Sequence, residues 1–302
     1  MSTHYTNEEI QKAATNIRKH VLQLTLERNG CYLSQACSSA ELLATLYMGI
    51  LNFSESNAPA VPGPFPGTPS KDNMDFVKGA DYHGSLKAPY DRLFISPAHY
   101  AAPVYAALIE AGRMAPDALK MFNRDGYAME MIGANHTPGF ENAAGTLDQA
   151  ISMAAGTAHS RKLKGEQGKI YVMMSDGEMQ EGQLWEAIQA AAFYKLDNLV
   201  LLVDINGQQV EGPTDDVMAI EPLDKRFEAF GAKAVKVDGH NIEEIKAAVA
   251  QGETGKPLVV LCYTSPTQGI PYLEERRPIL HFVRLKAGEE YDKYMDFYQK
   301  MQ

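Results

Sequence analysis

Three carboxylates follow one another within a short stretch of this sequence. Asp176, Glu178 and Glu181 lie in the turn that follows the apolar run 170–174. A short apolar run bounded by polar residues predicts a buried strand, so the three side chains would place negative charge where water is scarce. Buried charge needs a cation or hydrogen-bond donors to compensate it. The stretch therefore predicts a site that binds something positively charged.

A second polar side chain is expected beside this turn. Asn206 follows a strand predicted over 198–204, and a helix predicted over 183–195 joins that strand to the strand 169–174. Parallel strands joined by a helix open their carboxyl ends onto one crevice, so Asp176 and Asn206 are placed to share a ligand. The helix is apolar on almost every side, which predicts packing between the sheet and another layer.

The ligand that these oxygens favour is a divalent cation. A carboxylate, an amide oxygen and a backbone carbonyl make an all-oxygen set suited to Mg²⁺, with Ca²⁺ or Mn²⁺ as alternatives. A cation with so few protein ligands is usually completed by a diphosphate, and Gly177 lets backbone N–H groups approach its phosphates. Taken alone, Asp176-Gly177 and Asn206-Gly207 are also ordinary turns. The specific signal is the pair, with a helix between the two strands.

The elements that position the site alternate along the chain. Helices are predicted over 7–28 and over 38–51, the second with a capping box of Ser38 and Glu41. A Pro- and Gly-rich loop, 53–89, is either a lid or contact surface or a tolerated insertion. Beyond the site elements, the chain predicts a strand and helix over 91–112, a helix ending at Gly165, strand 232–238, helix 241–250 and strand 257–264. This alternation predicts an α/β fold with a mostly parallel sheet and helices on both faces, in one diphosphate- and Mg²⁺-binding domain over 1–302.

The composition excludes several classes of function. A net charge of −10 and the lack of any basic run argue against a surface for nucleic acid or anionic membranes. No apolar stretch approaches the length of a membrane span, and the polar start of the chain is unlike a secretory signal. Three cysteines without a CxxC pair favour small buried thiols and a reducing cytoplasm over disulfides or a metal site: Cys31, Cys37 and Cys262.

Several motifs make the sequence resemble a known family. Asp-Gly-Glu at 176–178, Glu-Gly and Trp-Glu-Ala within 181–187, and Asp-x-Asn at 204–206 resemble the thiamine diphosphate signature of transketolases. Further stretches follow the order of transketolase amino-terminal halves and cover nearly the whole chain: SSAELLATLYMG, DRLFISPAHY, TPGFENAAGTLDQAIS, VDGHNIEEI and TQGIPYLEERRPILH. The chain is thus similar to the amino-terminal section of a split, two-chain transketolase.

The resemblance implies a site for thiamine diphosphate and Mg²⁺. The Mg²⁺ ligands would be Asp176, Asn206 and the main-chain carbonyl of Gln208. Gly177 and Glu178 would lie beside the diphosphate. The other cofactor contacts implied are Gly145 and Leu147 beside the aminopyrimidine and thiazolium, Val210 as an apolar wall of the thiazolium, and His99 near the diphosphate.

The reaction implied by the resemblance is transfer of a two-carbon ketol unit, or a related acyl unit, from a ketose-type donor to an aldehyde acceptor. His99 and His281 would be its acid and base groups, and Glu181 would serve a proton relay between two active sites. The family's Gly-His-x-Gly-Gly-Ser stretch reads CYLSQA here, which places Tyr32 at the histidine position, as a hydroxyl donor or a packing aromatic. Further departures from the family pattern are Ala98, Asp148, Ala150 and Ser175. Cofactor positions are thus kept while substrate-facing positions change.

The resemblance also implies a partner. The sequence ends about where the pyrimidine-binding domain of a transketolase begins, so we expect a separate carboxy-terminal subunit with that domain, in a dimer of heterodimers. Helix 183–195 and loop 53–89 are the expected contacts. Two other interpretations stay open: another thiamine diphosphate enzyme, such as an acyloin synthase or a 2-oxoacid dehydrogenase α-type subunit, and a non-catalytic cofactor-binding scaffold.

Overall fold

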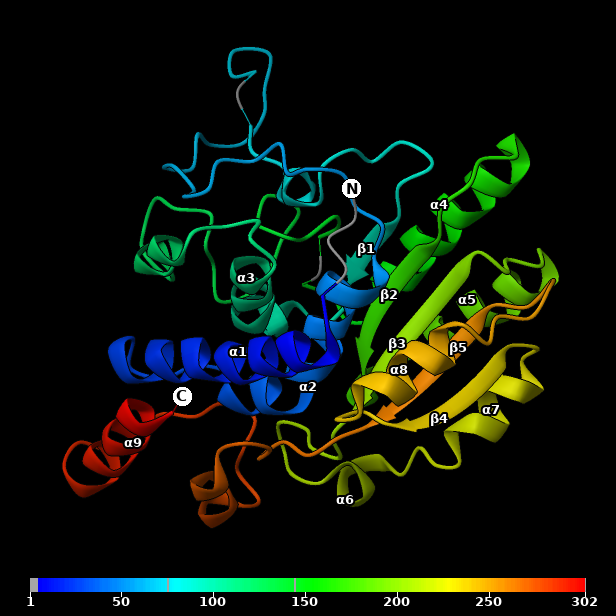
Figure 1. The fold of residues 1–302 in the computed structure, drawn as a ribbon. Helices are drawn as coiled ribbons and strands as arrows, with labels where there is room; N and C mark the ends of the chain where they lie inside the picture. Colours follow the sequence, from blue (N-terminus) through cyan, green and yellow to red (C-terminus); the bar gives the residue numbers. More distant parts are fainter. Residues whose placement is uncertain (1–4, 75, 144, 302) are drawn as a thin grey trace.

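A computed structural model describes residues 5–74, 76–143 and 145–301. Five parallel strands form one sheet in the order β1-β2-β3-β5-β4 (Figure 1). The strands are β1 (Arg92–Ile95), β2 (Ile170–Ser175), β3 (Leu199–Ile205), β4 (Lys233–Asp238) and β5 (Leu258–Tyr263). The predicted α/β fold is confirmed, and the last four strands begin and end within one residue of the positions expected from the sequence.

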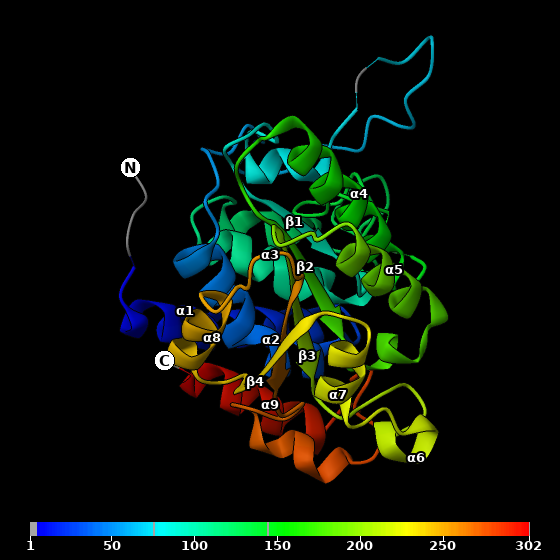
Figure 2. The same cartoon turned by 90° about the vertical axis from the view of Figure 1, so that its right-hand side faces the viewer.

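Helices cover both faces of the sheet, as the turned view in Figure 2 shows. On one face lie α1 (Asn7–Glu27), α2 (Leu33–Thr45), α3 (Ala101–Glu110) and α8 (Ile242–Val249), and α9 (Glu289–Lys300) packs against α1. On the other face lie α4 (Gln149–Lys164), α5 (Gly182–Phe193) and α7 (Leu223–Ala229). The remaining helices are short: α6 (Thr214–Met218), a π-helical turn (Leu46–Ile50), and the 3₁₀ helices Gly79–His83, Ala98–Tyr100, Pro116–Met121, Asp176–Gln180 and Pro271–Arg276.

Side chains of the inner strands alternate between the two helical layers. Met173 and Leu202 join the core under α1, α2 and α3, whereas Val172 and Leu201 join the core under α4 and α5. Every residue of β2 and β3 is buried, which explains why both strands read as continuous apolar runs. Within the described ranges, no helix is long and apolar enough to cross a membrane.

The capping box predicted at Ser38 and Glu41 is wrong. Helix α2 begins at Leu33, and both residues are buried inside it. Ser38 Oγ donates to Asp204 Oδ2 at 2.6 Å, and Glu41 pairs with the buried Arg18. A Ser and a Glu three positions apart also share one face of a helix, and here that face has tertiary partners. The α-helix ends at Thr45, and a π-helical turn continues it to Ile50.

The loop 53–89 lies away from the site-bearing end of the sheet (Figure 1). Its described part has one short helix, Gly79–His83, as expected for a segment without regular structure. Arg113 ties the loop to the domain, because its guanidinium donates to the carbonyls of Tyr82 and Ser54 at 2.9 and 3.0 Å. Whether this loop contacts a partner stays a prediction.

Candidate functional site

The loops after β2 and β3 meet at the carboxyl edge of the sheet. The Gly207 N–H donates to Asp176 Oδ2 at 2.7 Å, and Thr214 Oγ1 donates to the same oxygen at 3.2 Å. Gly207 has a φ of +69°, which glycine adopts without strain and which turns the chain back toward Asp176. Asn206 Oδ1 accepts the N–H of Gln208 at 2.9 Å. The structure thus brings the predicted cation ligands into one pair of adjoining turns.

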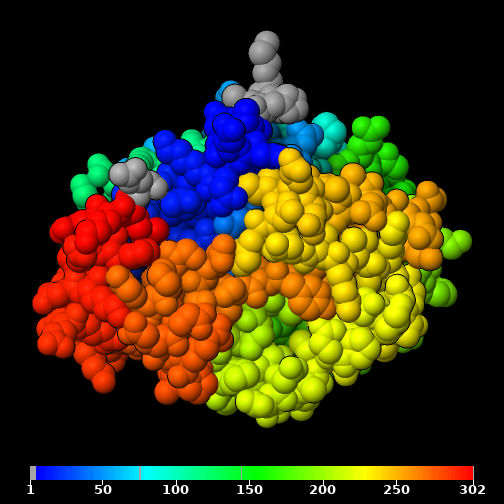
Figure 3. All heavy atoms as spheres, turned by 60° about the horizontal axis from the view of Figure 1, so that its bottom comes forward, coloured from blue at the N-terminus to red at the C-terminus, as the bar shows by residue number. Residues whose placement is uncertain are grey.

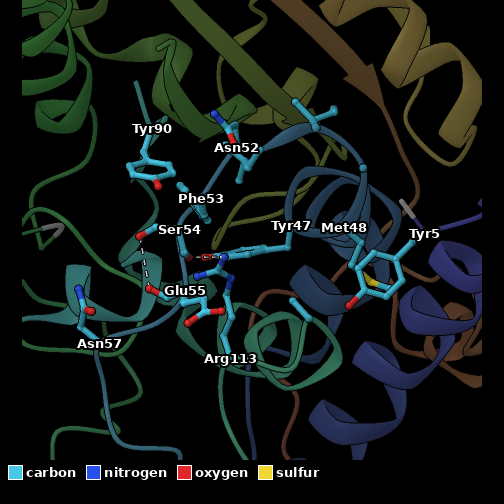
Figure 4. A pocket seen from close by; sticks show the side chains of 14 residues that line it. Tyr5, Tyr47, Met48, Asn52, Phe53, Ser54, Glu55, Asn57, Tyr90 and Arg113 are labelled. Carbon is cyan, nitrogen blue, oxygen red and sulfur yellow. Dashed lines mark hydrogen bonds between the residues drawn. The ribbon is translucent and has the colours of Figure 1, made fainter. Parts of the chain in front are cut away.

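This edge of the molecule is hollowed. Figure 3 shows the hollow between the segment that follows β3, in yellow-green, and the segment that follows β5, in orange. Two pockets lie on other parts of the surface. One of about 960 Å³ lies at the amino end of β1, where Asn52, Tyr90 and Arg113 line it (Figure 4). The other, of about 840 Å³, lies along α4. Neither is lined by any of the site residues expected from the sequence.

Asp176 is the electrostatic centre of the site. Its side chain is buried, and burial together with the carboxylate of Asp204 raises its pKa to about 7. The N–H of Gly177, at 2.9 Å from Oδ1, joins the donors of Gly207 and Thr214 in stabilising the charged form. Among the described residues these partners are all uncharged. A bound cation would therefore supply charge compensation that the protein itself leaves incomplete.

The residues present fit a divalent cation. The described ranges hold no cluster of three or more His, Cys, Asp or Glu side chains suited to a metal. The predicted set has only one such side chain, Asp176, and its other members are the amide oxygen of Asn206 and the backbone carbonyl of Gln208 in the adjoining turn. Hard oxygen ligands in that number leave room for water or phosphate oxygens, as Mg²⁺ sites usually do. The chemistry of the donors agrees with the expected group.

A second buried carboxylate, Asp204, holds the elements around the site together. Its Oδ2 accepts from Ser38 Oγ at 2.6 Å and from the Tyr100 hydroxyl at 2.8 Å, and its Oδ1 accepts from Thr264 Oγ1 at 2.5 Å. The amide of Asn206 donates to the Tyr100 hydroxyl at 3.2 Å, which orients it. Sequence reasoning gave Asp204 no role. The available signal was a charged residue inside an apolar strand, two positions before Asn206.

Glu178 has its hydrogen bonds inside the protein. The N–H groups of Ser175 and Asp148 donate to its carboxylate at 2.8 and 3.0 Å, and the Ser96 hydroxyl also donates to it. Burial raises the pKa of Glu178 to about 7, although these donors oppose the shift. The negative charge expected in this turn is thus compensated in part by donors that link β2, β1 and the start of α4.

Asp148 is the most strained of the departures from the family pattern. It directly precedes α4 with a φ of +67°, in the left-handed region that favours glycine. Its side chain is fully buried, and neither carboxyl oxygen has a partner among the described residues. Burial, with Glu178 and Glu181 nearby, raises its pKa to about 8. A glycine here would remove both the backbone strain and the buried acid.

Replacing Asp148 is therefore expected to stabilise the purified chain. Asp148→Gly should raise the free energy of unfolding by about 2 kcal/mol at pH 8. The folded pKa lies above the ordinary value of 3.8, so the cost of the carboxylate is absent below about pH 4 and grows as pH rises toward 8. Thermal melting from pH 4 to 8 measures this. Asp148→Asn, which tolerates the same backbone, should show the same pH-dependent gain, and a gain independent of pH would refute the assignment.

Three aromatic side chains from distant parts of the chain form a cluster at the same edge. Tyr32 precedes α2, His99 lies in the 3₁₀ helix after β1, and His281 lies in the segment after β5. Ring centroids are 5.3 Å apart for Tyr32 and His99, 5.4 Å for Tyr32 and His281, and 4.9 Å for the two histidines. Phe282 also packs on Tyr32, at 5.1 Å. The predicted acid, base and hydroxyl groups are thus neighbours.

Both histidines of this cluster are held neutral. Burial, and then the neighbouring His281, lowers the pKa of His99 to about 3. Burial also lowers the pKa of His281, against an opposing effect of Glu211. Burial and Cys31 raise the pKa of Tyr32, so its hydroxyl keeps its proton. At neutral pH each ring can accept or donate a hydrogen bond without carrying charge.

The remaining predicted residues lie on the surface. Gly145 and Glu181 are exposed, and the apolar side chains of Leu147 and Val210 are 37% and 63% exposed. The sequence predicts that α5 packs between the sheet and another layer, and the described residues of this chain cover only part of the helix. Its inner face is buried against the sheet, but Phe193 at its end is 77% exposed. Apolar residues exposed beside a site are typical of a surface that another molecule covers.

A parallel sheet with polar turns after its strands belongs to the class of α/β domains that bind ligands at the carboxyl edge of the sheet. Comparison with known protein families specifies the class further. The family described as "Transketolase, thiamine diphosphate binding domain" matches residues 87–289. The chain belongs to this transketolase family, as the thiamine-diphosphate-binding amino-terminal section, and is accordingly a transferase.

Two relatives of similar length are named as transketolase subunits. The chain is 31% identical to an apulose-4-phosphate transketolase subunit of Actinobacillus succinogenes, over 94% of this chain and 93% of that protein. It is also 31% identical to "6-deoxy-6-sulfo-D-fructose transketolase subunit SqwG" of a Clostridium species, over 88% of each chain. The crystal structure of Campylobacter jejuni transketolase matches with a TM-score of 0.76 and 25% identity, over 98% of this chain but 43% of that one.

Proposed function

We propose that this chain is the Mg²⁺- and cofactor-binding subunit of a two-chain transketolase. The enzyme transfers a two-carbon ketol unit from a ketose-type donor to an aldehyde acceptor. The observation that carries the proposal is the convergence of the Asp176 and Asn206 turns with the cluster of Tyr32, His99 and His281 at one edge of the sheet. The free, buried state of the three cysteines supports a reducing, cytoplasmic location.

Each residue has a separate task in this proposal. Asp176, Asn206 and the carbonyl of Gln208 hold Mg²⁺, and Gly177 leaves its backbone open to the diphosphate. Thiamine diphosphate, when bound, supplies the electron sink for cleavage of a carbon–carbon bond. His99 and His281, both neutral, exchange protons with substrate hydroxyl and carbonyl oxygens, and Tyr32 donates from its hydroxyl.

The surface residues serve the assembly. Leu147, Val210 and Gly145 are exposed, so we assign them to contacts with the thiazolium and aminopyrimidine rings that a partner completes. Glu181 directly precedes α5 and is exposed, which suits a relay to a second active site in a dimer of heterodimers. The word "subunit" in the names of two relatives supports a separate carboxy-terminal chain with the pyrimidine domain.

The function is tested by turnover with that partner present. The chain is co-purified with a candidate carboxy-terminal subunit, and ketose donors and 2-oxoacids are supplied with an aldehyde acceptor. Ketol transfer from a ketose that depends on thiamine diphosphate supports the proposal. Product from 2-oxoacids alone would assign the chain to acyloin-type chemistry, and no product from either class would favour a scaffold.

Tyr32 gives a prediction about the donor. Because a tyrosine replaces the family's histidine, the wild type should use xylulose 5-phosphate poorly, and Tyr32→His should raise kcat/KM for it by about tenfold. Steady-state kinetics with both enzymes checks this. Tyr32→Phe is the matched control, since it keeps the ring packing but lacks the hydroxyl. If the wild type uses this donor as fast as a full-length transketolase assayed in parallel, the inference fails.

A further inference from the structure

Gln35 lies in the first turn of α2, where it contacts the catalytic cluster. Its side chain is 4% exposed, and its Nε2 lies 3.3 Å from Nδ1 of His281. The hydroxyl of Ser39 donates to the Gln35 carbonyl at 2.5 Å, so the backbone that carries the amide is held in place. In the stretch CYLSQA this residue stands where the family pattern has a glycine. The chain thus adds a polar side chain beside His281.

The contact sets the form of the imidazole. An amide N–H can only donate, so His281 Nδ1 is the acceptor and the ring proton lies on Nε2. The rings of Tyr32 and His99 pack on the same imidazole at 5.4 and 4.9 Å. His281 therefore presents Nε2–H as a donor, with Gln35 fixing the orientation of the ring.

The other end of the amide lacks a partner. Gln35 Oε1 is buried and accepts no hydrogen bond from the described residues. The preceding residue, Ser34, is also buried, and its hydroxyl has no hydrogen-bond partner among the described residues. Buried polar atoms without partners are rare in folded proteins and call for an explanation. Because the two polar atoms of an amide are adjacent, Oε1 lies close to the imidazole that Nε2 contacts.

We propose that Gln35 is a specificity-determining residue that binds a hydroxyl group of the sugar-like substrate. Oε1 accepts a hydrogen bond from that hydroxyl, while Nε2 holds His281 in the form that donates to a neighbouring substrate oxygen. The inference rests on the proposed function and deepens it. It assigns an uncharged, hydroxyl-bearing part of the substrate to this end of the site.

Gln35→Met tests the hydrogen bonds at nearly constant volume. With the partner present, the variant should raise KM for a ketose donor about tenfold, whereas kcat should change by less than about threefold. Gln251→Met, an exposed glutamine beyond α8, is the control and should leave both constants unchanged. An unchanged KM in a Gln35→Met enzyme that melts like the wild type would overturn the inference.

The pH profile of Gln35→Glu distinguishes a role at His281 from a purely structural role, which would leave the profile unchanged. A carboxylate accepts from His281 Nδ1 and favours the charged imidazole, so the acidic limb of the kcat/KM profile should move up by about one pH unit. The other groups that face His281 are Tyr32, His99 and Glu211, and all are unchanged in the variant. A profile identical to the wild type would contradict the assignment. If the wild-type enzyme with its partner shows no turnover of any ketose, that result refutes the proposed function instead.

Discussion

Asp176→Ala is expected to abolish Mg²⁺-dependent binding of thiamine diphosphate, with a loss of affinity of more than about 100-fold. Asp176 is the only charged side chain of the proposed cation site, and the N–H of Gly207 and the hydroxyl of Thr214 bind it in place. Without Asp176 the cation is not held, and the negative charges of the diphosphate and of Glu178 and Glu181 would lie close together without a cation to compensate them. Calorimetry of the co-purified enzyme, with and without Mg²⁺, measures the effect.

The matched control is Asp215→Ala, an exposed acid in the first turn of α6. It should bind the cofactor as the wild type does. Thermal melting distinguishes lost ligand binding from lost folding. The carboxylate of Asp176 is buried with a pKa raised to about 7, so its removal should not destabilise the ligand-free chain at pH 8. Unchanged cofactor affinity in Asp176→Ala would exclude this turn as the cation site.

The sequence predicted the part of the site whose residues are placed by the strands that they directly follow. Asp176 and Asn206 each follow a predominantly apolar strand directly, and parallel strands place their last residues at a common edge. The five-stranded fold was predictable for the same reason, because β2 and β3 are buried on both faces and are apolar apart from Ser175 and Asp204 near their ends. Position relative to a strand end was therefore enough to bring these two residues together.

The rest depends on contacts between distant segments. Tyr32, His99 and His281 were selected by resemblance, and no spacing in the sequence shows that their rings pack together. The strained backbone of Asp148 and the bond from Gln35 to His281 are set by how α2, α4 and the segment after β5 pack. The failed capping box has the same origin, because Ser38 bonds to Asp204 across the core.

The chain alone is expected to be inactive, with less than about 1% of the turnover measured when the carboxy-terminal subunit is added. The site has a cation end, at Asp176, and a substrate end, at His99 and His281. Its walls for the thiazolium and aminopyrimidine are open, because Leu147 and Val210 are 37% and 63% exposed. An open site admits water and does not hold the cofactor in a fixed orientation. Because the reaction rate depends on holding the cofactor and the substrate in the right geometry, most of the rate is lost.

The exposed end of α5 allows the partner contact to be tested separately. Phe193→Ser, on a side chain that is 77% exposed, should leave the melting temperature of the isolated chain within a few degrees and weaken its complex with the partner. Leu163→Ser, at 75% exposure near the end of α4, is the matched control for loss of an exposed apolar side chain on the same face of the sheet. Light scattering and turnover with increasing partner concentration measure both variants. Robust turnover by the wild-type chain without any partner would refute the two-chain enzyme, because the exposed walls of the site would then need no second chain to cover them.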